Sequence, residues 1–174
     1  MNVGRPLPGH STAGCAIRRH VSERPDKEYF TVAEANAHIE TLRRLFGQVM
    51  QMRMHLKGLY KSLEAAGFPP NQEDEDEDED LPPDVTHDRA LFLAMAETLR
   101  DQIEEILATG CVIKDVESGL VDWPALYEGR EIWLCWKYGE QEVGYWHELN
   151  SGFAGRRPVS ELQQSGDPKS PPRM

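Results

Sequence analysis

The chain lacks the cysteine pairs, the long apolar run and the basic surplus that mark several common protein classes. Its three cysteines, Cys15, Cys111 and Cys135, form no Cys-x-x-Cys motif. This excludes a disulfide framework and a zinc finger, and it favours a reducing cytoplasm. No stretch of about 18 apolar residues occurs, so we expect no membrane-spanning helix and no membrane partner. The basic residues near the start precede no apolar segment and predict no signal peptide.

The net charge of −11 is concentrated in one segment. Positions 73–80 alternate Glu and Asp without interruption, and Pro-Pro pairs flank this run on both sides. Adjacent like charges repel one another and have no apolar surface to bury, so residues 67–84 are expected to form a disordered acidic linker. We expect that a Gly/Ser spacer could replace it without loss of stability. Docking of a basic partner is the alternative role. The rest of the chain has no broad basic face, which argues against nucleic-acid binding.

Both ends of the chain have compositions that disfavour regular structure. Residues 1–27 are low in apolar side chains and show no periodicity, and residues 159–174 end in a proline-rich segment. We therefore expect both ends to be disordered. The intervening residues 28–158 are enough for one domain with a real core.

Two long helices are predicted, one on each side of the acidic linker. The first spans about residues 32–66: Thr31 and Glu34 form a capping box at its start, and Gly67 offers a left-handed stop. Its apolar side chains recur at spacings of three and four, which is typical of a helix that packs against another helix. The second spans about residues 86–109. Together they predict an antiparallel, coiled-coil-like hairpin, whose longer first helix has apolar positions left to cover another element or a second copy.

The pattern changes to alternation after the second helix. Residues 111–158 are expected to form a small, mostly antiparallel sheet of three or four strands, which makes the fold class α+β. The clearest strands are 132–138 and 143–149, separated by a turn at 139–142.

The turn length decides which residues of these two strands face each other. A four-residue turn would pair Leu134 with His147 and keep one face almost wholly apolar. A three-residue turn would pair Leu134 with Trp146 and mix the faces. The first register is preferred on this ground, and it places His147 on the face of Trp136 rather than that of Cys135.

Several segments resemble one known family. They are Tyr-Phe-Thr-Val-Ala-Glu-Ala-Asn at 29–36, Lys114-Asp115 with Gly119-Leu-Val-Asp-Trp-Pro-Ala, Gly129-Arg-Glu-Ile-Trp-Leu-Cys-Trp, Tyr145-Trp-His-Glu-Leu, and Gly152-Phe-Ala-Gly-Arg-Arg-Pro. Over about residues 29–158 the chain resembles the bacterial domain-of-unknown-function family 2203. The resemblance implies helices followed by a small β element, and it brings no known function and no catalytic residue. The basic N-terminal segment and the acidic linker look like additions to the family pattern.

Five polar residues in the last third of the chain are candidate ligand-binding residues. Two adjacent guanidinium groups that follow a glycine-containing segment suit a carboxylate or a phosphate. An imidazole suits proton transfer near neutral pH. In the alternative interpretation these groups are structural, with an arginine paired to a carboxylate at the edge of the sheet and the histidine satisfied by a buried partner. The five residues are His147, Arg156, Arg157, Asp122 and Glu131.

No complete catalytic, metal or nucleotide motif is present. Cys135 is interpreted as a buried structural thiol that behaves as a small apolar side chain. A zinc site would need ligands with a recognisable spacing, and the sequence shows none. The methionines at 50, 52 and 54 face different directions on a helix, so they do not suggest a copper site. We therefore predict no catalytic residue, no metal and no cofactor.

Two classes of function fit these features. The favoured one is a cytoplasmic interaction or scaffold protein, in which the helical hairpin and the aromatic-rich sheet hold an unidentified protein partner or a second copy as a homodimer. The alternative is a small module at the sheet end that binds an anionic ligand or catalyses a reaction. The absence of a complete catalytic constellation favours the first class.

Overall fold

The computed structural model describes residues 27–70 and 81–163 of the chain. Helices precede a sheet, so the fold class is α+β as predicted. Disorder was expected for residues 1–27, 67–84 and 159–174, and most of these positions (1–26, 71–80 and 164–174) lie outside the described residues. The expectation is wrong at two places, because residues 83–84 begin α3 and residues 160–163 form α4. The elements in chain order are α1 (Val32–Ala37), α2 (Ile39–Ala65), α3 (Pro83–Leu107), β1 (Val112–Asp115), β2 (Leu120–Tyr127), β3 (Arg130–Lys137), β4 (Tyr145–Glu148), η2 (Phe153–Gly155), β5 (Arg157–Pro158) and α4 (Ser160–Gln163).

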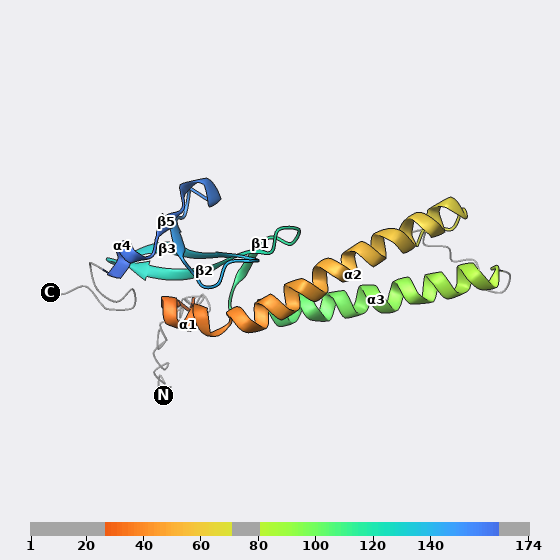
Figure 1. Cartoon of the computed structure of the whole chain (residues 1–174), viewed down its shortest axis with the longest axis horizontal. Coiled ribbons are helices and arrows are strands. Elements are labelled where there is room, and N and C mark those ends of the chain that lie inside the picture. The colour runs from red at the N-terminus through yellow and green to blue at the C-terminus, as the bar shows by residue number, and fades with distance from the viewer. Residues whose placement is uncertain (1–26, 71–80, 164–174) are drawn as a thin grey trace, which may run out of the picture.

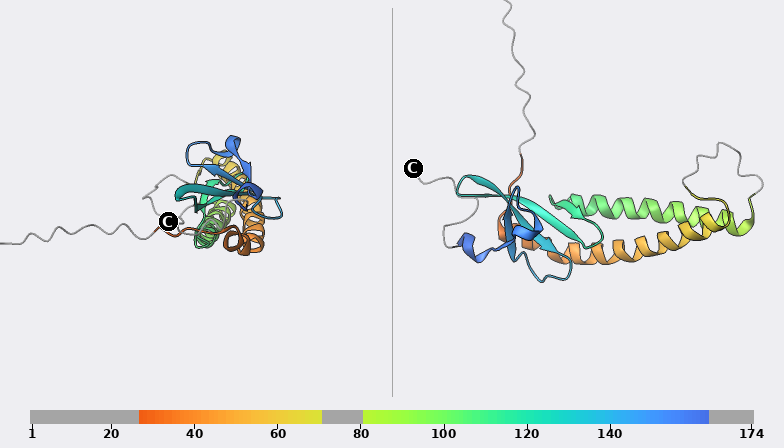
Figure 2. Two further views of the ribbon diagram at one scale, coloured as in Figure 1. Left: turned by 90° about the vertical axis from the view of Figure 1, so that its left-hand side faces the viewer. Right: turned by 90° about the horizontal axis from the view of Figure 1, so that it is seen from above.

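The capping box that starts the helical part is confirmed. The Thr31 hydroxyl accepts a hydrogen bond from the backbone N–H of Glu34 at 3.1 Å, and the Glu34 carboxylate accepts one from the backbone N–H of Thr31 at 2.8 Å. The helix that begins here is divided at His38 into the short α1 and the long α2. Helices α2 and α3 lie side by side and extend away from the sheet (Figures 1 and 2).

The sheet has five strands, so the expected three or four are too few. The strands are antiparallel and lie in the order β1-β2-β3-β4-β5, each beside its neighbour in sequence. The additional strand is β5, which pairs with β4. Because β5 is only two residues long and contains a proline, its sequence carries no alternation that could announce a strand.

The preferred pairing of β3 with β4 is wrong by one residue. Leu134 faces Trp146, as in the rejected register. Val143 is not part of the β4 ladder, because its backbone N–H donates to the Asn36 side chain of α1 at 2.7 Å. The shift buries Trp146 against the helices and leaves Tyr145 40% exposed. A tryptophan buries more apolar surface than a tyrosine, so burying Trp146 in place of Tyr145 stabilises the sheet by a larger hydrophobic free energy.

The hydrophobic core lies between one face of the sheet and the first part of the helical region (Figure 1). Alternate residues of β2, β3 and β4 supply the sheet side of this core. The other side comes from α1, the first half of α2 and the last turns of α3. The largest buried side chains are Trp123, Trp136, Trp146 and Phe46. We call the opposite face of the sheet the outer face. By the strand register it carries Asp122, Trp133, Cys135, Tyr145 and His147.

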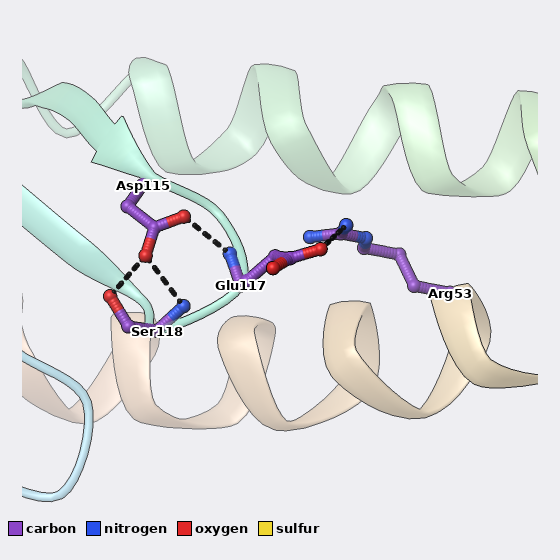
Figure 3. Close-up of polar contacts among 4 residues, drawn as sticks. All are labelled: Arg53, Asp115, Glu117 and Ser118. Atoms are coloured by element: carbon purple, nitrogen blue, oxygen red, sulfur yellow. Dashed lines mark hydrogen bonds and ion pairs between the residues drawn. The ribbon is translucent and has the colours of Figure 1, made fainter.

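The turn between β1 and β2 is held by a short polar network and tied to α2 (Figure 3). The Asp115 carboxylate accepts hydrogen bonds from the Ser118 hydroxyl and from the backbone N–H groups of Glu117 and Ser118. These donors, the Ser118 hydroxyl first, hold the pKa of Asp115 below its usual range. Glu117 in turn forms an ion pair with Arg53 of α2 at 2.9 Å. The network fixes the loop that leads into β2.

Candidate functional site

A buried polar cluster lies on the outer face of the sheet. It consists of Asp122 from β2, Cys135 from β3 and His147 from β4. Asp122 faces Cys135 directly across the strand pair, and His147 lies one strand further on, opposite Trp133. The three side chains sit in three adjacent strands, with residue exposures of 2%, 0% and 3%. Their possible ligand atoms all lie within 4.8 Å of one another.

The hydrogen bonds of His147 define the geometry of this cluster. Its Nδ1 lies 2.8 Å from the backbone carbonyl oxygen of Glu148, and its Nε2 lies 3.1 Å from Oδ2 of Asp122. A carbonyl oxygen only accepts hydrogen bonds, so Nδ1 carries a proton. Nε2 therefore points at the carboxylate, either with a second proton or with its lone pair. The other carboxylate oxygen, Oδ1 of Asp122, is buried and has no hydrogen-bond partner.

Lys114 and Trp133 lie beside the cluster. Lys114 comes from the irregular end of β1, and its Nζ lies 3.7 Å from Oδ2 of Asp122. The same ammonium lies 4.2 Å from the centre of the Trp133 ring, within the range of a cation–π contact. About a third of the Lys114 side chain is exposed, at 35%, whereas that of Asp122 is 2% exposed. Of the residues in and around the cluster, Lys114 thus has its side chain partly in contact with solvent, while Asp122 does not.

The thiol of Cys135 is protonated in this environment. Burial raises the pKa of Cys135 well above its ordinary value, and the neighbouring Asp122 carboxylate raises it further. A bare thiolate next to a carboxylate would bring two negative charges together in a buried place. The second described cysteine, Cys111, is also buried, and burial raises its pKa to about 11. Its sulfur lies 3.4 Å from the backbone carbonyl oxygen of Ile106, at the end of α3.

Glu131 lies on the same face of the sheet, but its carboxylate binds residues at the start of the described chain rather than the cluster. Its carboxylate accepts hydrogen bonds from Nζ of Lys27, at 2.8 Å, and from the Tyr29 hydroxyl. These two donors, Lys27 first, hold the pKa of Glu131 below its usual range. Both partners belong to the segment that leads into α1, so Glu131 fastens that segment to β3.

The two arginines predicted to bind a ligand have internal partners. Arg156 donates to Glu140 at 2.6 Å, and its guanidinium stacks on the rings of Tyr145 and Phe153, at 4.0 and 4.6 Å from their centres. Arg157 of β5 forms an ion pair with Glu161 of α4, four residues further on, and lies over the Trp146 ring. Their guanidinium groups therefore hold residues 153–161 against the sheet.

Of the five residues expected to bind a ligand, the structure brings Asp122 and His147 into direct contact. Two further members of the site, Cys135 and Lys114, were not among them. Cys135 was missed because the preferred register put His147 on the opposite face from it. Lys114 was missed for another reason: it lies at the register shift between Ile113 and Asp115, which strict alternation along β1 does not reveal. The alternative three-residue turn, which the sequence allowed, would have placed His147 and Cys135 on one face.

The two arginines should differ in their effect on stability. Arg156→Ala removes a side chain that is only 11% exposed and leaves Oε1 of Glu140 without its charged partner, so we expect a loss of about 1–3 kcal/mol in the free energy of unfolding. Arg157→Ala removes a half-exposed ion pair and should lower it by less than about 1 kcal/mol. Urea unfolding of both variants measures the difference. Equal losses would contradict the distinct roles assigned to them.

These features define the chain as a small α+β protein with two long helices, a five-stranded antiparallel sheet and a buried carboxylate–imidazole–thiol cluster. The family model described as "Uncharacterized conserved protein (DUF2203)" matches residues 28–159, and the chain belongs to that family. No curated protein and no solved structure matches it. Among the described residues, no helix is long and apolar enough to cross a membrane.

Proposed function

We propose that the chain is an interaction protein whose helical hairpin, formed by α2 and α3, pairs with a second copy to give a homodimer. The observation that carries this proposal is the exposure of large apolar side chains along the hairpin. Leu93 is 55% exposed, Leu107 is 46% exposed and Leu91 is 41% exposed on α3, and Met54 is 72% exposed on α2. Apolar side chains repeated along an extended helical surface favour a protein partner.

The exposed leucines of α3 are arranged for helix packing. Leu93 and Leu107 are separated by two heptads, so they lie on one stripe of the helix, with Arg100 between them. This stripe differs from the one that contacts α2, where Phe92 meets the ring of Tyr60. A second helical surface is thus presented outside the hairpin's own interface.

Charge favours a second copy as the occupant of that surface. Helix α2 contains five Lys or Arg residues and two Glu, whereas α3 contains six Asp or Glu residues and two Arg. In a two-fold symmetric dimer, α2 of one copy can lie beside α3 of the other, which brings the basic helix to the acidic one. Such complementarity sets the orientation of the partners more than their affinity. The acidic run that joins the two helices favours an arrangement with the two tips apart, because like charges repel.

Sedimentation velocity at tens of micromolar protein tests the proposal. The native chain should sediment as a dimer, and Leu93→Glu or Leu107→Glu should weaken association by at least tenfold, because each introduces a charge into the apolar stripe. Ala94→Glu is the matched control, since Ala94 is exposed on the same helix but lies outside both stripes. A strictly monomeric native chain, or equal dissociation of the Ala94→Glu variant, would refute the proposal.

A cytoplasmic location is part of the proposal and is supported by the free thiols of Cys111 and Cys135. The small anionic-ligand module, which the sequence left as the alternative, receives less support from the arginines, since both have carboxylate partners. The observation that favours ligand binding at the sheet is the buried cluster of Asp122, Cys135 and His147, rather than the two arginines.

A further inference from the structure

We infer that Asp122, Cys135 and His147 form a binding site for a zinc ion on the outer face of the sheet. This site is independent of the proposed dimer, because its three residues lie on β2, β3 and β4 rather than on the hairpin. Carboxylate oxygen, thiolate sulfur and imidazole nitrogen are all ligands that zinc accepts. The mixture of nitrogen and sulfur disfavours magnesium and calcium, which prefer oxygen ligands alone.

The first argument is the orientation of the His147 ring. Its Nδ1–H donates to the backbone carbonyl of Glu148, so in the neutral tautomer the lone pair of Nε2 points at Oδ2 of Asp122, 3.1 Å away. In that tautomer two acceptors face each other, so a cation beside them stabilises the pair. The Lys114 ammonium lies 3.7 Å from this oxygen, and a zinc ion would take its place. Metal-binding histidines in proteins commonly have this arrangement, with the other ring nitrogen donating to a backbone carbonyl or a carboxylate.

The second argument is the unpaired carboxylate oxygen. Oδ1 of Asp122 is buried and has no hydrogen-bond partner, although Asp122 itself is only 2% exposed. A buried carboxylate oxygen without a donor is unfavourable, and native structures rarely leave one. A bound cation would satisfy it.

The distances require only a small adjustment. The ligand atoms lie within 4.8 Å of one another. Zinc bonds of about 2.0–2.3 Å in a tetrahedron place their ligand atoms roughly 3.3–3.8 Å apart. Side-chain rotations that move the ligand atoms by about one ångström would close the difference. On binding, the Cys135 thiol transfers its proton to solvent and its thiolate joins the metal, so the charges of Asp122 and Cys135 balance those of zinc. Three protein ligands leave one position of the metal for water or an added ligand.

Lys114 provides a further test of the zinc site, because its ammonium would compete with zinc for the Asp122 carboxylate. Its ammonium lies 3.7 Å from the Asp122 oxygen that also faces His147, and its stem is partly exposed. The ammonium must move away when the metal enters. Lys114→Met should therefore raise zinc affinity several-fold. If Lys114 were instead part of a purely structural ion pair, the same substitution would change stability without creating any affinity for metal.

The experiment uses the full chain, without an affinity tag, reduced and stripped of metal by a chelator. Cobalt(II) serves as a spectroscopic probe, because a cysteine thiolate bound to it produces charge-transfer absorption in the near ultraviolet. Calorimetry with zinc alone measures stoichiometry and affinity. We expect one ion per chain, with affinity at least a hundredfold lower for Cys135→Ser and for His147→Gln. The acidic run at 73–80 could bind cations through oxygen, but it could not give thiolate absorption.

Two matched controls lie outside the cluster. Cys111→Ser alters another buried thiol, and His55→Gln alters an exposed imidazole on α2. Both should keep the native affinity within about a factor of two. X-ray absorption is measured on the zinc complex of the Cys15→Ser chain, which leaves the buried cluster unchanged and removes the cysteine that lies between His10 and His20, so it decides the matter even if a substitution within the cluster impairs folding. One sulfur at about 2.3 Å is expected. A native chain that binds no zinc, or a metal shell without sulfur, would overturn the inference and leave a buried imidazolium–carboxylate pair.

Discussion

Trp123→Ala is expected to lower the free energy of unfolding by about 3–5 kcal/mol, the range for truncation of a large aromatic side chain in a core. Trp123 lies in the middle of β2, is fully buried, and packs in the core between the sheet and the helices. Its indole N–H also donates to the backbone carbonyl of Thr109 at 3.1 Å, and that acceptor would lose its partner. Native domains have a total stability of about 5–15 kcal/mol, so this change alone could remove a large part of it.

Urea unfolding followed by far-ultraviolet circular dichroism measures this loss without relying on tryptophan emission. Trp133→Ala is the matched control, because Trp133 lies on the outer face and is only partly buried. It should lower the free energy of unfolding by about 1–2 kcal/mol, through loss of partial burial and of its contacts with Lys114 and Lys27. Equal losses for the two variants would mean that the core does not lie on the Trp123 face.

The features that could be predicted from the sequence are those decided by neighbouring residues. Thr31 and Glu34 are three positions apart, so their reciprocal hydrogen bonds could be inferred directly, and they are present. Gly67 was expected as a helix stop and has a positive φ of +88°. Gly110, which directly follows the expected end of the second helix, also has a positive φ, +78°. The α+β class followed from the change of periodicity after the second helix.

The register of β3 and β4 could not be predicted in the same way. It depends on Asn36 of α1, which accepts the backbone N–H of Val143 from a distance of more than a hundred residues in sequence. A rule that keeps one face apolar does not foresee this contact. It also does not weigh the burial of Trp146 against that of Tyr145. Because side chains alternate, an error of one residue moved His147 to the wrong face.

The candidate site was only partly predictable for the same reason. Asp122 and His147 were both expected to be functional, but their contact across β3 depends on the true register. Arg156 and Arg157 attracted attention as adjacent cations. Their partners, Glu140 and Glu161, lie in a turn and in a short helix that give no periodic signal. The sequence alone does not show which carboxylate pairs with which arginine between such segments, so these ion pairs could not be predicted.

Gly110→Ala should destabilise the protein by about 2–4 kcal/mol. Gly110 follows α3 with φ of +78°, a conformation that alanine adopts at a cost of about 1–2 kcal/mol. An added Cβ would also lie 2.2 Å from Cζ of Phe30, which no packed structure tolerates. Phe30 is buried and cannot retreat easily, because its backbone N–H donates to the carbonyl of Pro124 at 2.8 Å. Overpacking of this kind typically costs 1–3 kcal/mol. Thermal and urea unfolding measure the loss.

Gly67→Ala separates the two contributions, because Gly67 also has positive φ at the end of a helix but has nothing within 4 Å of an added Cβ. It should lower the free energy of unfolding only by the conformational part, about 1–2 kcal/mol. The excess loss in Gly110→Ala then measures the contact with Phe30. Adding Phe30→Leu to Gly110→Ala removes the clashing ring atom, so the two changes should be less than additive. Additive losses would show that Phe30 does not pack on Gly110, and that the segment before α1 is not held against the end of α3.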